Sequence, residues 1–272
     1  SAEAIPPTGA RPVFCDIDLD TFCVTAETVR AALTPRTKAV VAVDLFGNPA
    51  PVGEIEALGV PVLEDAAQAA GSTLRGRKAG SLGTAATFSF YPSKNLAAFG
   101  DGGAVATDDD GISELVRVLR SHGTKDKATF ERLGFNSRLD ELQAALLRVA
   151  LPKLDEWSDG RRAAARHYEA ASLGELVRPP QPTAGADPAW HLYVVRHDDP
   201  GRIGAALAAA GIGHKAYYRT PVHRQPAMRD YGAPELPATE EAARTHLAIP
   251  MSPTLGRGQA EAVTAAVRNA CS

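Results

Sequence analysis

The sequence has few cysteines, no long apolar run and no concentration of basic residues, and each absence excludes a class of protein. No stretch approaches the roughly 20 apolar residues of a membrane span, so no membrane protein is predicted. Cys15, Cys23 and Cys271 match neither a disulfide framework nor a metal-ligand spacing, so we expect no metal site and a reducing compartment, the cytoplasm. A net charge of -3 without a basic stripe excludes a nucleic-acid surface. Small molecules are therefore the predicted partners.

The size and composition of the chain suit a globular protein with two cores. It has 272 residues, 44% of them hydrophobic and 22% charged, and no internal repeat. No signal peptide is recognised, and the chain begins at Ser1 without an initiator methionine, directly before sequence typical of a strand. We therefore expect that an upstream segment is missing.

Apolar runs alternate with helix-prone segments through the first half of the chain. Strands are predicted over 12–16, 39–43, 60–65 and 102–107, and a helix over 26–33 behind Thr25 as its cap. Continuous apolar strands separated by helices indicate an α/β fold, with a mostly parallel sheet and helices on both faces. Ligands of such sheets bind at the carboxyl ends of the strands.

The second half of the chain predicts a smaller unit. A helix is expected from Ser137, with Leu139, Leu142, Leu146 and Val149 on one face, followed by a helix over 153–171 and a proline-rich loop over 179–188. Strands over 190–195 and 214–218 and helices over 201–210 and 259–270 would form a C-terminal α+β unit. We expect a large domain over 1–155 and a small one over 156–272.

Two side chains carry the predicted chemistry. Asp65 ends the run Val-Leu-Glu-Asp, and Lys94 follows the run Phe-Ser-Phe-Tyr-Pro-Ser. An acid that can hold a protonated pyridine nitrogen and an amine that can form a Schiff base are both required by a pyridoxal 5'-phosphate (PLP) enzyme. Taken singly, a lysine is more often a solvated surface residue, and an aspartate at a strand end can cap a helix. The pair together points to PLP.

The chain resembles the DegT/DnrJ/EryC1/StrS family of PLP-dependent sugar aminotransferases over nearly its whole length. The motifs that carry the resemblance, in the family's order, are 12–16, 44–48, 64–68, 80–83, 88–96, 100–103, 134–138 with 139–143, and 190–192. The resemblance implies the type I PLP aminotransferase fold. The N-terminal part of that fold is expected to be absent, because neither the phosphate-binding Gly-Thr turn nor the ring-stacking aromatic of the family precedes Pro12.

The resemblance also implies a role for each cofactor-binding residue. Asp65 would accept the pyridine N1–H, and Lys94 would bind the cofactor covalently and shuttle the substrate proton. Gln68 would lie beside the ring and its phenolic oxygen, and Ser89 would donate to the cofactor phosphate. Asn136 matches an asparagine that reaches the phosphate of a neighbouring subunit, which implies a homodimer with shared active sites. Structural hydrogen bonding for Gln68 and Ser89, and a helix cap for Asn136, are the alternatives.

The substrate contacts rest on weaker signals. The candidates are Tyr91, His191, Tyr217, Tyr218, Arg219 and His223. Family members often carry His-Tyr where this chain has two tyrosines, which leaves one sugar contact open. Lys215, Arg219 and Arg224 could supply cations for a nucleotide diphosphate, although such residues more often form a solvated face. Packed aromatics and a satisfied strand histidine are the alternatives for the tyrosines and His191.

Together these features predict transfer of an amino group, from L-glutamate, to a nucleotide-linked keto-sugar in amino-sugar biosynthesis for an antibiotic or a polysaccharide. Amination at C3 of a deoxy keto-sugar is preferred over C4 or a keto-inositol. Lys94 argues against the family's dehydratase branch, which has histidine there. A non-catalytic ligand-binding relative is the alternative that the missing front segment would favour.

Overall fold

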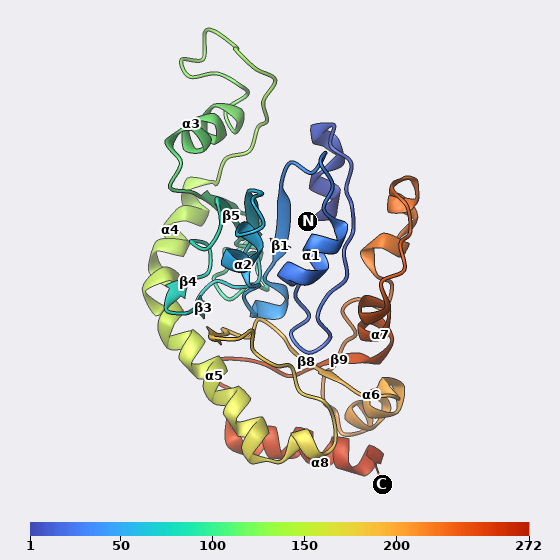
Figure 1. Cartoon of the computed structure of the whole chain (residues 1–272). Coiled ribbons are helices and arrows are strands. Elements are labelled where there is room, and N and C mark those ends of the chain that lie inside the picture. The colour runs from blue at the N-terminus through green and yellow to red at the C-terminus, as the bar shows by residue number, and fades with distance from the viewer. Residues whose placement is uncertain (272) are drawn as a thin grey trace.

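A computed structural model describes residues 1–271, with a four-stranded sheet among helices, a small three-stranded sheet and a two-stranded sheet towards the C-terminus (Figure 1). The strands are β1 (Val40–Val43), β2 (Val62–Asp65), β3 (Thr73–Leu74), β4 (Arg77–Lys78), β5 (Ala85–Ser89), β6 (Gly103–Ala106), β7 (Ala186–Asp187), β8 (Tyr193–Arg196) and β9 (His246–Ile249). The helices are α1 (Ala26–Ala32), α2 (Val52–Glu56), α3 (Asp110–Leu119), α4 (Glu141–Ala150), α5 (Leu154–Ala170), α6 (Pro200–Ala209), α7 (Pro237–Thr245) and α8 (Arg257–Cys271).

The larger sheet has the order β1-β2-β5-β6, and its first three strands run parallel. The predicted mostly parallel α/β sheet is therefore confirmed. β6 is antiparallel to β5 and pairs Gly103 with Ser89. A Cβ at Gly103 would lie 2.6 Å from the carbonyl oxygen of Phe88, so the absence of a side chain lets the two strands approach. The parallel register brings the carboxyl ends of β2 and β5 to one edge of the sheet.

Helix α1 begins where its cap was predicted. The amide of Thr28 donates to Thr25 Oγ1 at 3.2 Å, and the amide of Thr25 donates to Thr28 Oγ1 at 3.0 Å. This reciprocal pair satisfies two amides that the first turn of a helix leaves without partners. Val29 of the same helix is buried in the cluster that surrounds β1 and β2.

Two predicted strands are wrong. The segment 12–16 has no ladder partner, because Pro12 lacks an amide donor and Asp16 is drawn to a helix instead. The carboxylate of Asp16 accepts from the amides of Ala238 and Thr239 in the first turn of α7, at 3.0 and 2.8 Å. The segment 214–218 makes a single bridge to β9 and does not continue as a strand.

The helix predicted from Ser137 begins at Glu141, as α4, after Asp140 in an extended conformation. It continues through a short 3-10 turn into α5, and Figure 1 shows the two as one long curved rod along the side of the molecule. The face predicted from leucine spacing is only partly covered by this chain: Leu139 packs in a cluster with Leu147, whereas Leu142 is 80% and Val149 77% exposed. Leu147 is the residue of α4 that is buried against the rest of the chain.

Separate hydrophobic clusters stabilise the four-stranded sheet and the two-stranded sheet. One cluster packs α2 and its neighbours against β1 and β2, and another packs α5, α6 and α8 around β8 and β9. In the second cluster the rings of Tyr168 and Tyr193 stack with centroids 5.2 Å apart. A third cluster joins the two regions through Phe22, Phe46 and Val194.

Candidate active site

Asp65 and Lys94 lie at or just after the ends of two neighbouring strands of the parallel sheet, β2 and β5. Asp65 is the last residue of β2, and Lys94 follows β5 in a turn in which its amide donates to the carbonyl of Tyr91 at 2.8 Å. Partial burial lowers the pKa of Lys94, and the negative charge of Asp65 acts in the opposite direction. The two predicted groups are therefore within electrostatic reach of each other.

The Asp65 carboxylate is oriented by the chain that follows it. Its Oδ1 accepts from the amide of Ala67 at 3.2 Å, and turns rather than a helix follow, so Asp65 does not cap a helix. Its Oδ2 accepts a short hydrogen bond from the hydroxyl of Ser1. A carboxylate oxygen at this position is an acceptor that would suit a pyridinium N–H.

Gln68 and Ser89 lie at this edge of the sheet, and the side-chain oxygen of each accepts a hydrogen bond from a backbone amide. Gln68 Oε1 accepts from the amide of Phe46 at 2.6 Å, which fixes the turn after β1 beside the turn after β2. The hydroxyl oxygen of Ser89, at the end of β5, accepts from the amide of Tyr91 at 3.3 Å. Within residues 1–271 the Ser89 O–H and the Gln68 side-chain N–H groups donate no hydrogen bond, so both could donate to a ligand.

His191 lies beside Lys94 and is held as a neutral imidazole. It is buried, and burial lowers its pKa to about 3, with further lowering by the positive charges of Lys94 and Arg161. Its Nδ1 is enclosed and has no hydrogen-bond partner within residues 1–271. The Arg161 guanidinium donates to the carbonyls of Trp190 and His191 at 3.0 and 3.4 Å, a contact that no sequence motif indicated.

Backbone contacts place the segment before His191 against the lysine loop. Asn95, next to Lys94, donates through Nδ2 to the carbonyl of Ala189 at 3.1 Å. Gly47 has a positive φ of 93°, and a Cβ there would lie 2.6 Å from the amide nitrogen of His191. The close approach of these segments positions the imidazole at the edge that carries Asp65 and Lys94.

Two further acids lie buried beneath the site. Glu64 accepts from the amides of Gly80 and Leu82 at 2.6 and 2.9 Å, which holds the loop between β4 and β5. Burial raises the pKa of Asp44 well above its usual range, and the charge of Glu64 adds to the effect. Asp44 also accepts from the amide of Ala50 at 2.8 Å. Both acids support the loops of the site.

The remaining predicted contacts lie in different environments. Tyr91, Tyr218 and Asn136 are exposed, and Asn136 accepts from the Arg138 guanidinium at 2.7 Å without capping α4. Tyr217 is half-buried and packs in the third cluster. His223 is fully buried, with Nε2 3.3 Å from a Glu240 carboxylate oxygen, a contact typical of a structural histidine.

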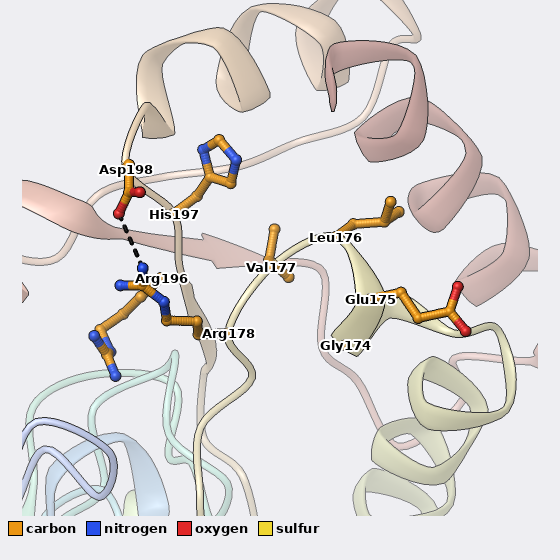
Figure 2. Close-up of a pocket in the computed structure, with 8 residues that line it drawn as sticks. All are labelled: Gly174, Glu175, Leu176, Val177, Arg178, Arg196, His197 and Asp198. Atoms are coloured by element: carbon orange, nitrogen blue, oxygen red, sulfur yellow. Dashed lines mark hydrogen bonds and ion pairs between the residues drawn. The ribbon is translucent and has the colours of Figure 1, made fainter. Parts of the chain in front are cut away.

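A separate recess of about 280 Å³ lies in the C-terminal region and includes none of the predicted site residues (Figure 2). Its lining residues are Gly174, Glu175, Leu176, Val177, Arg178, Arg196, His197 and Asp198. The figure shows Arg178 joined to Asp198, an ion pair of 3.2 Å. Within residues 1–271, no group of three or more His, Cys, Asp or Glu side chains could hold a metal ion. In the same part of the chain, no helix is long and apolar enough to cross a membrane.

The fold and this donor set define a class of protein. A carboxylate for a pyridinium nitrogen, a partly desolvated amine and a free hydroxyl at the edge of a parallel sheet fit PLP, and they are the groups of a PLP-dependent aminotransferase. The model of the DegT/DnrJ/EryC1/StrS aminotransferase family matches residues 1–268, and the chain belongs to this family. The resemblance, the fold, the cofactor PLP and the enzyme class predicted from the sequence are thereby confirmed.

Relatives with known names are similar over most of their length. The pleiotropic regulatory protein of Geobacillus stearothermophilus is 43% identical over 97% of this chain and 73% of that protein. The dTDP-3-amino-3,4,6-trideoxy-alpha-D-glucose transaminase of Streptomyces venezuelae is 42% identical over 97% of this chain and 72% of that protein. The crystal structure of S. venezuelae DesV with a ketimine intermediate has a TM-score of 0.94 and 42% identity, covering 98% of this chain and 74% of that one.

Proposed function

We propose that this protein transfers an amino group from L-glutamate to the keto group of a nucleotide-linked sugar, with C3 of a deoxy keto-sugar as the preferred position. The observation that carries the proposal is that Asp65 and Lys94 lie at or just after the ends of neighbouring parallel strands, close enough for the charge of Asp65 to raise the pKa of Lys94. The names of two relatives support the substrate and the position. They are the dTDP-sugar transaminase named above and the UDP-N-acetyl-3-dehydro-alpha-D-glucosamine 3-aminotransferase of Acidithiobacillus ferrooxidans, which is 39% identical.

In the proposed mechanism each residue has one task. PLP, when bound, supplies the electron sink that stabilises negative charge on the amine-bearing carbon. Asp65 keeps a proton on the pyridine nitrogen through a charge-assisted hydrogen bond. Lys94 would hold the cofactor covalently, and its amine would move the proton at the substrate carbon. Ser89 donates to the cofactor phosphate, and Gln68 lies beside the ring.

The reaction can be followed by the absorbance of the cofactor. We expect the protein with PLP to absorb as a yellow complex. It should lose that absorbance with L-glutamate as 2-oxoglutarate is released, and regain it with a 3-keto nucleotide sugar as the amino-sugar forms. If a 4-keto sugar or a keto-inositol is the better acceptor, the proposed preference for a 3-keto sugar is wrong. A complex that forms but never responds to any amino donor would favour the non-catalytic, ligand-binding alternative.

We further propose that two copies of the chain associate through the face made by α4 and the loop after α3. This face carries large apolar side chains that the chain itself leaves exposed, among them Leu133 at 97%. The others are Phe99, Phe130, Phe135, Leu142, Val149 and Leu151. Figure 1 shows α3 and its loop standing out from the rest of the molecule, where a second copy could be reached. Asn136 lies on that loop, which supports its proposed contact with the partner's cofactor.

A charge placed in this face tests the association. We expect Leu142→Glu to sediment as a monomer where the unaltered protein is a dimer, and to bind PLP more weakly, because a carboxylate would be desolvated in the apolar interface. Val13→Glu, which alters an exposed apolar residue elsewhere, is the matched control and should remain dimeric. An unaltered protein that sediments as a monomer with full PLP affinity would contradict the proposal.

A further inference from the structure

Turns from different parts of the chain meet around the backbone of His191. A Cβ at Gly47 would lie 2.6 Å from the amide nitrogen of His191, so only glycine permits this approach. The buried hydroxyl of Ser72 donates to the carbonyl of Gly47 at 2.8 Å and accepts from the amide of Ala189 at 2.9 Å. The segment that carries the imidazole is therefore fixed against the turns that follow β1 and β2.

The backbone on both sides of this contact is strained. Trp190, which precedes the histidine, has a φ of 43°, in the left-handed region that a bulky side chain rarely adopts. Phe46 in the facing turn has a φ of 60°, and its carbonyl accepts from the amide of Leu192 at 3.2 Å. Left-handed residues other than glycine cluster at ligand sites, where the surrounding structure imposes them. The strain therefore indicates that the position of the imidazole has a role in binding.

A partly buried cation supports the same turn. The guanidinium of Arg161, from α5, donates to the carbonyls of Trp190 and His191 at 3.0 and 3.4 Å. No carboxylate pairs with Arg161 within residues 1–271, and burial lowers the pKa of its guanidinium to about 10. A cation that loses water without gaining a counter-charge is costly, and the carbonyls of this turn are its partners. Arg161 thus fixes the orientation of the turn that carries the imidazole.

The imidazole is left with one group that could bind a ligand. Its Nδ1 is enclosed and unpartnered, and a proton there would be a buried donor without an acceptor, which is rarer in folded proteins than a buried free lone pair. Burial, and then the positive charges of Lys94 and Arg161, lower the pKa of His191 and disfavour a second proton on the ring. The ring proton therefore belongs on Nε2, which is not enclosed and makes no hydrogen bond within residues 1–271.

We propose that His191 is a further ligand-binding residue of this site, that its Nε2–H donates to an oxygen of the molecule bound at Lys94, and that Arg161 is the residue that positions it. This inference rests on the proposed function, in which the cofactor and the keto-sugar both bring oxygen acceptors to Lys94. A neutral N–H donor binds a carbonyl, hydroxyl or phenolic oxygen without placing a positive charge beside the protonated amine of Lys94, which it would repel.

Two replacements of the imidazole test this contact. His191→Phe keeps a flat ring and removes the donor, and we expect it to weaken the binding of PLP or of the nucleotide-linked keto-sugar about three- to tenfold, the loss of one hydrogen bond. His191→Gln, which has an amide N–H donor, should recover part of that binding. Titration with PLP followed by absorbance, and calorimetry of the keto-sugar with the PLP-loaded protein, identify which ligand brings the oxygen. His214→Phe, at an exposed histidine, is the matched control.

The role of Arg161 is tested by combining two variants. Arg161→Met should weaken binding of the same ligand as His191→Phe, and the double variant should bind no more weakly than His191→Phe alone, because the contact is already lost. Arg166→Met, at an exposed arginine of the same helix, should bind as the unaltered protein does. Losses of affinity that add in the double variant would contradict a positioning role, because Arg161 would then act independently of the imidazole.

The outcomes separate this inference from the proposed function, since both binding measurements proceed without amino transfer. Unchanged affinity for PLP and for the keto-sugar in His191→Phe, with a melting temperature like that of the unaltered protein, would overturn the contact. An unaltered protein that binds neither ligand would overturn it as well. A protein that shows the expected losses of affinity, but no absorbance change with L-glutamate, would refute the proposed function and leave the contact in place.

Discussion

Lys94→Ala should leave the protein unable to retain PLP covalently and should lower turnover by more than about 10³-fold. The variant loses both the amine that binds the cofactor and the base that moves the substrate proton. Borohydride reduction followed by mass spectrometry measures the first loss: the unaltered protein should gain one cofactor on the peptide with Lys94, and the variant should gain none. Steady-state formation of 2-oxoglutarate measures the second.

Another lysine shows whether the effect belongs to this position. Lys153 is exposed and pairs with Glu156 on the surface, so Lys153→Ala should keep the cofactor, the colour and the turnover of the unaltered protein. A colourless unaltered protein, or a reduced cofactor attached to a lysine other than Lys94, would contradict the assignment of the amine. Addition of free alkylamine should restore only part of the rate, because the covalent anchor is still missing.

Asp65→Asn should lower turnover by about 10²–10³-fold while leaving PLP attached to Lys94. The amide cannot hold the pyridine nitrogen in its protonated form, so the ring withdraws electrons less strongly from the substrate carbon. The half-reaction with L-glutamate, followed at the cofactor absorbance in a stopped-flow instrument, separates this chemical step from acceptor binding. A normal half-reaction rate in the variant would show that another group protonates the ring.

The same substitution should change the titration of the lysine. The carboxylate of Asp65 raises the pKa of Lys94 against the lowering effect of burial, so its removal should lower that pKa further. At a given pH the variant then has more unprotonated amine, and the pH profile of PLP attachment should move to lower pH. Asp108→Asn, which alters an exposed acid before α3, should leave the profile unchanged. A shift to higher pH would contradict the electrostatic pairing.

Much of the site could be predicted because its signals are local. Asp65 and Lys94 each end a run that reads as strand followed by turn, and strands of a parallel sheet present such ends along one edge. The capping box of α1 is likewise contained in four consecutive residues. The segments 12–16 and 214–218 have strand-like composition as well, but pairing depends on a partner, and neither segment has a ladder.

The division into domains at residue 155 and the homodimer remain predictions. The separate clusters around the two sheets suit the division, although the cluster of Phe22, Phe46 and Val194 crosses it. Leucine spacing predicted an apolar face of α4 over Leu142 and Val149, but these residues are exposed in this chain and the buried one is Leu147.

The sequence by itself determined the enzyme class, since the acid, the lysine and their strand ends are encoded in short runs. Only the tertiary structure decided the pKa of His191 and which residues surround Arg219. Burial beside two cations lowers the pKa of His191, and Arg219 lines one recess with Arg244 because α7 packs against its segment. Burial and long-range proximity are properties of the packed chain, and no spacing of residues along the sequence specifies them.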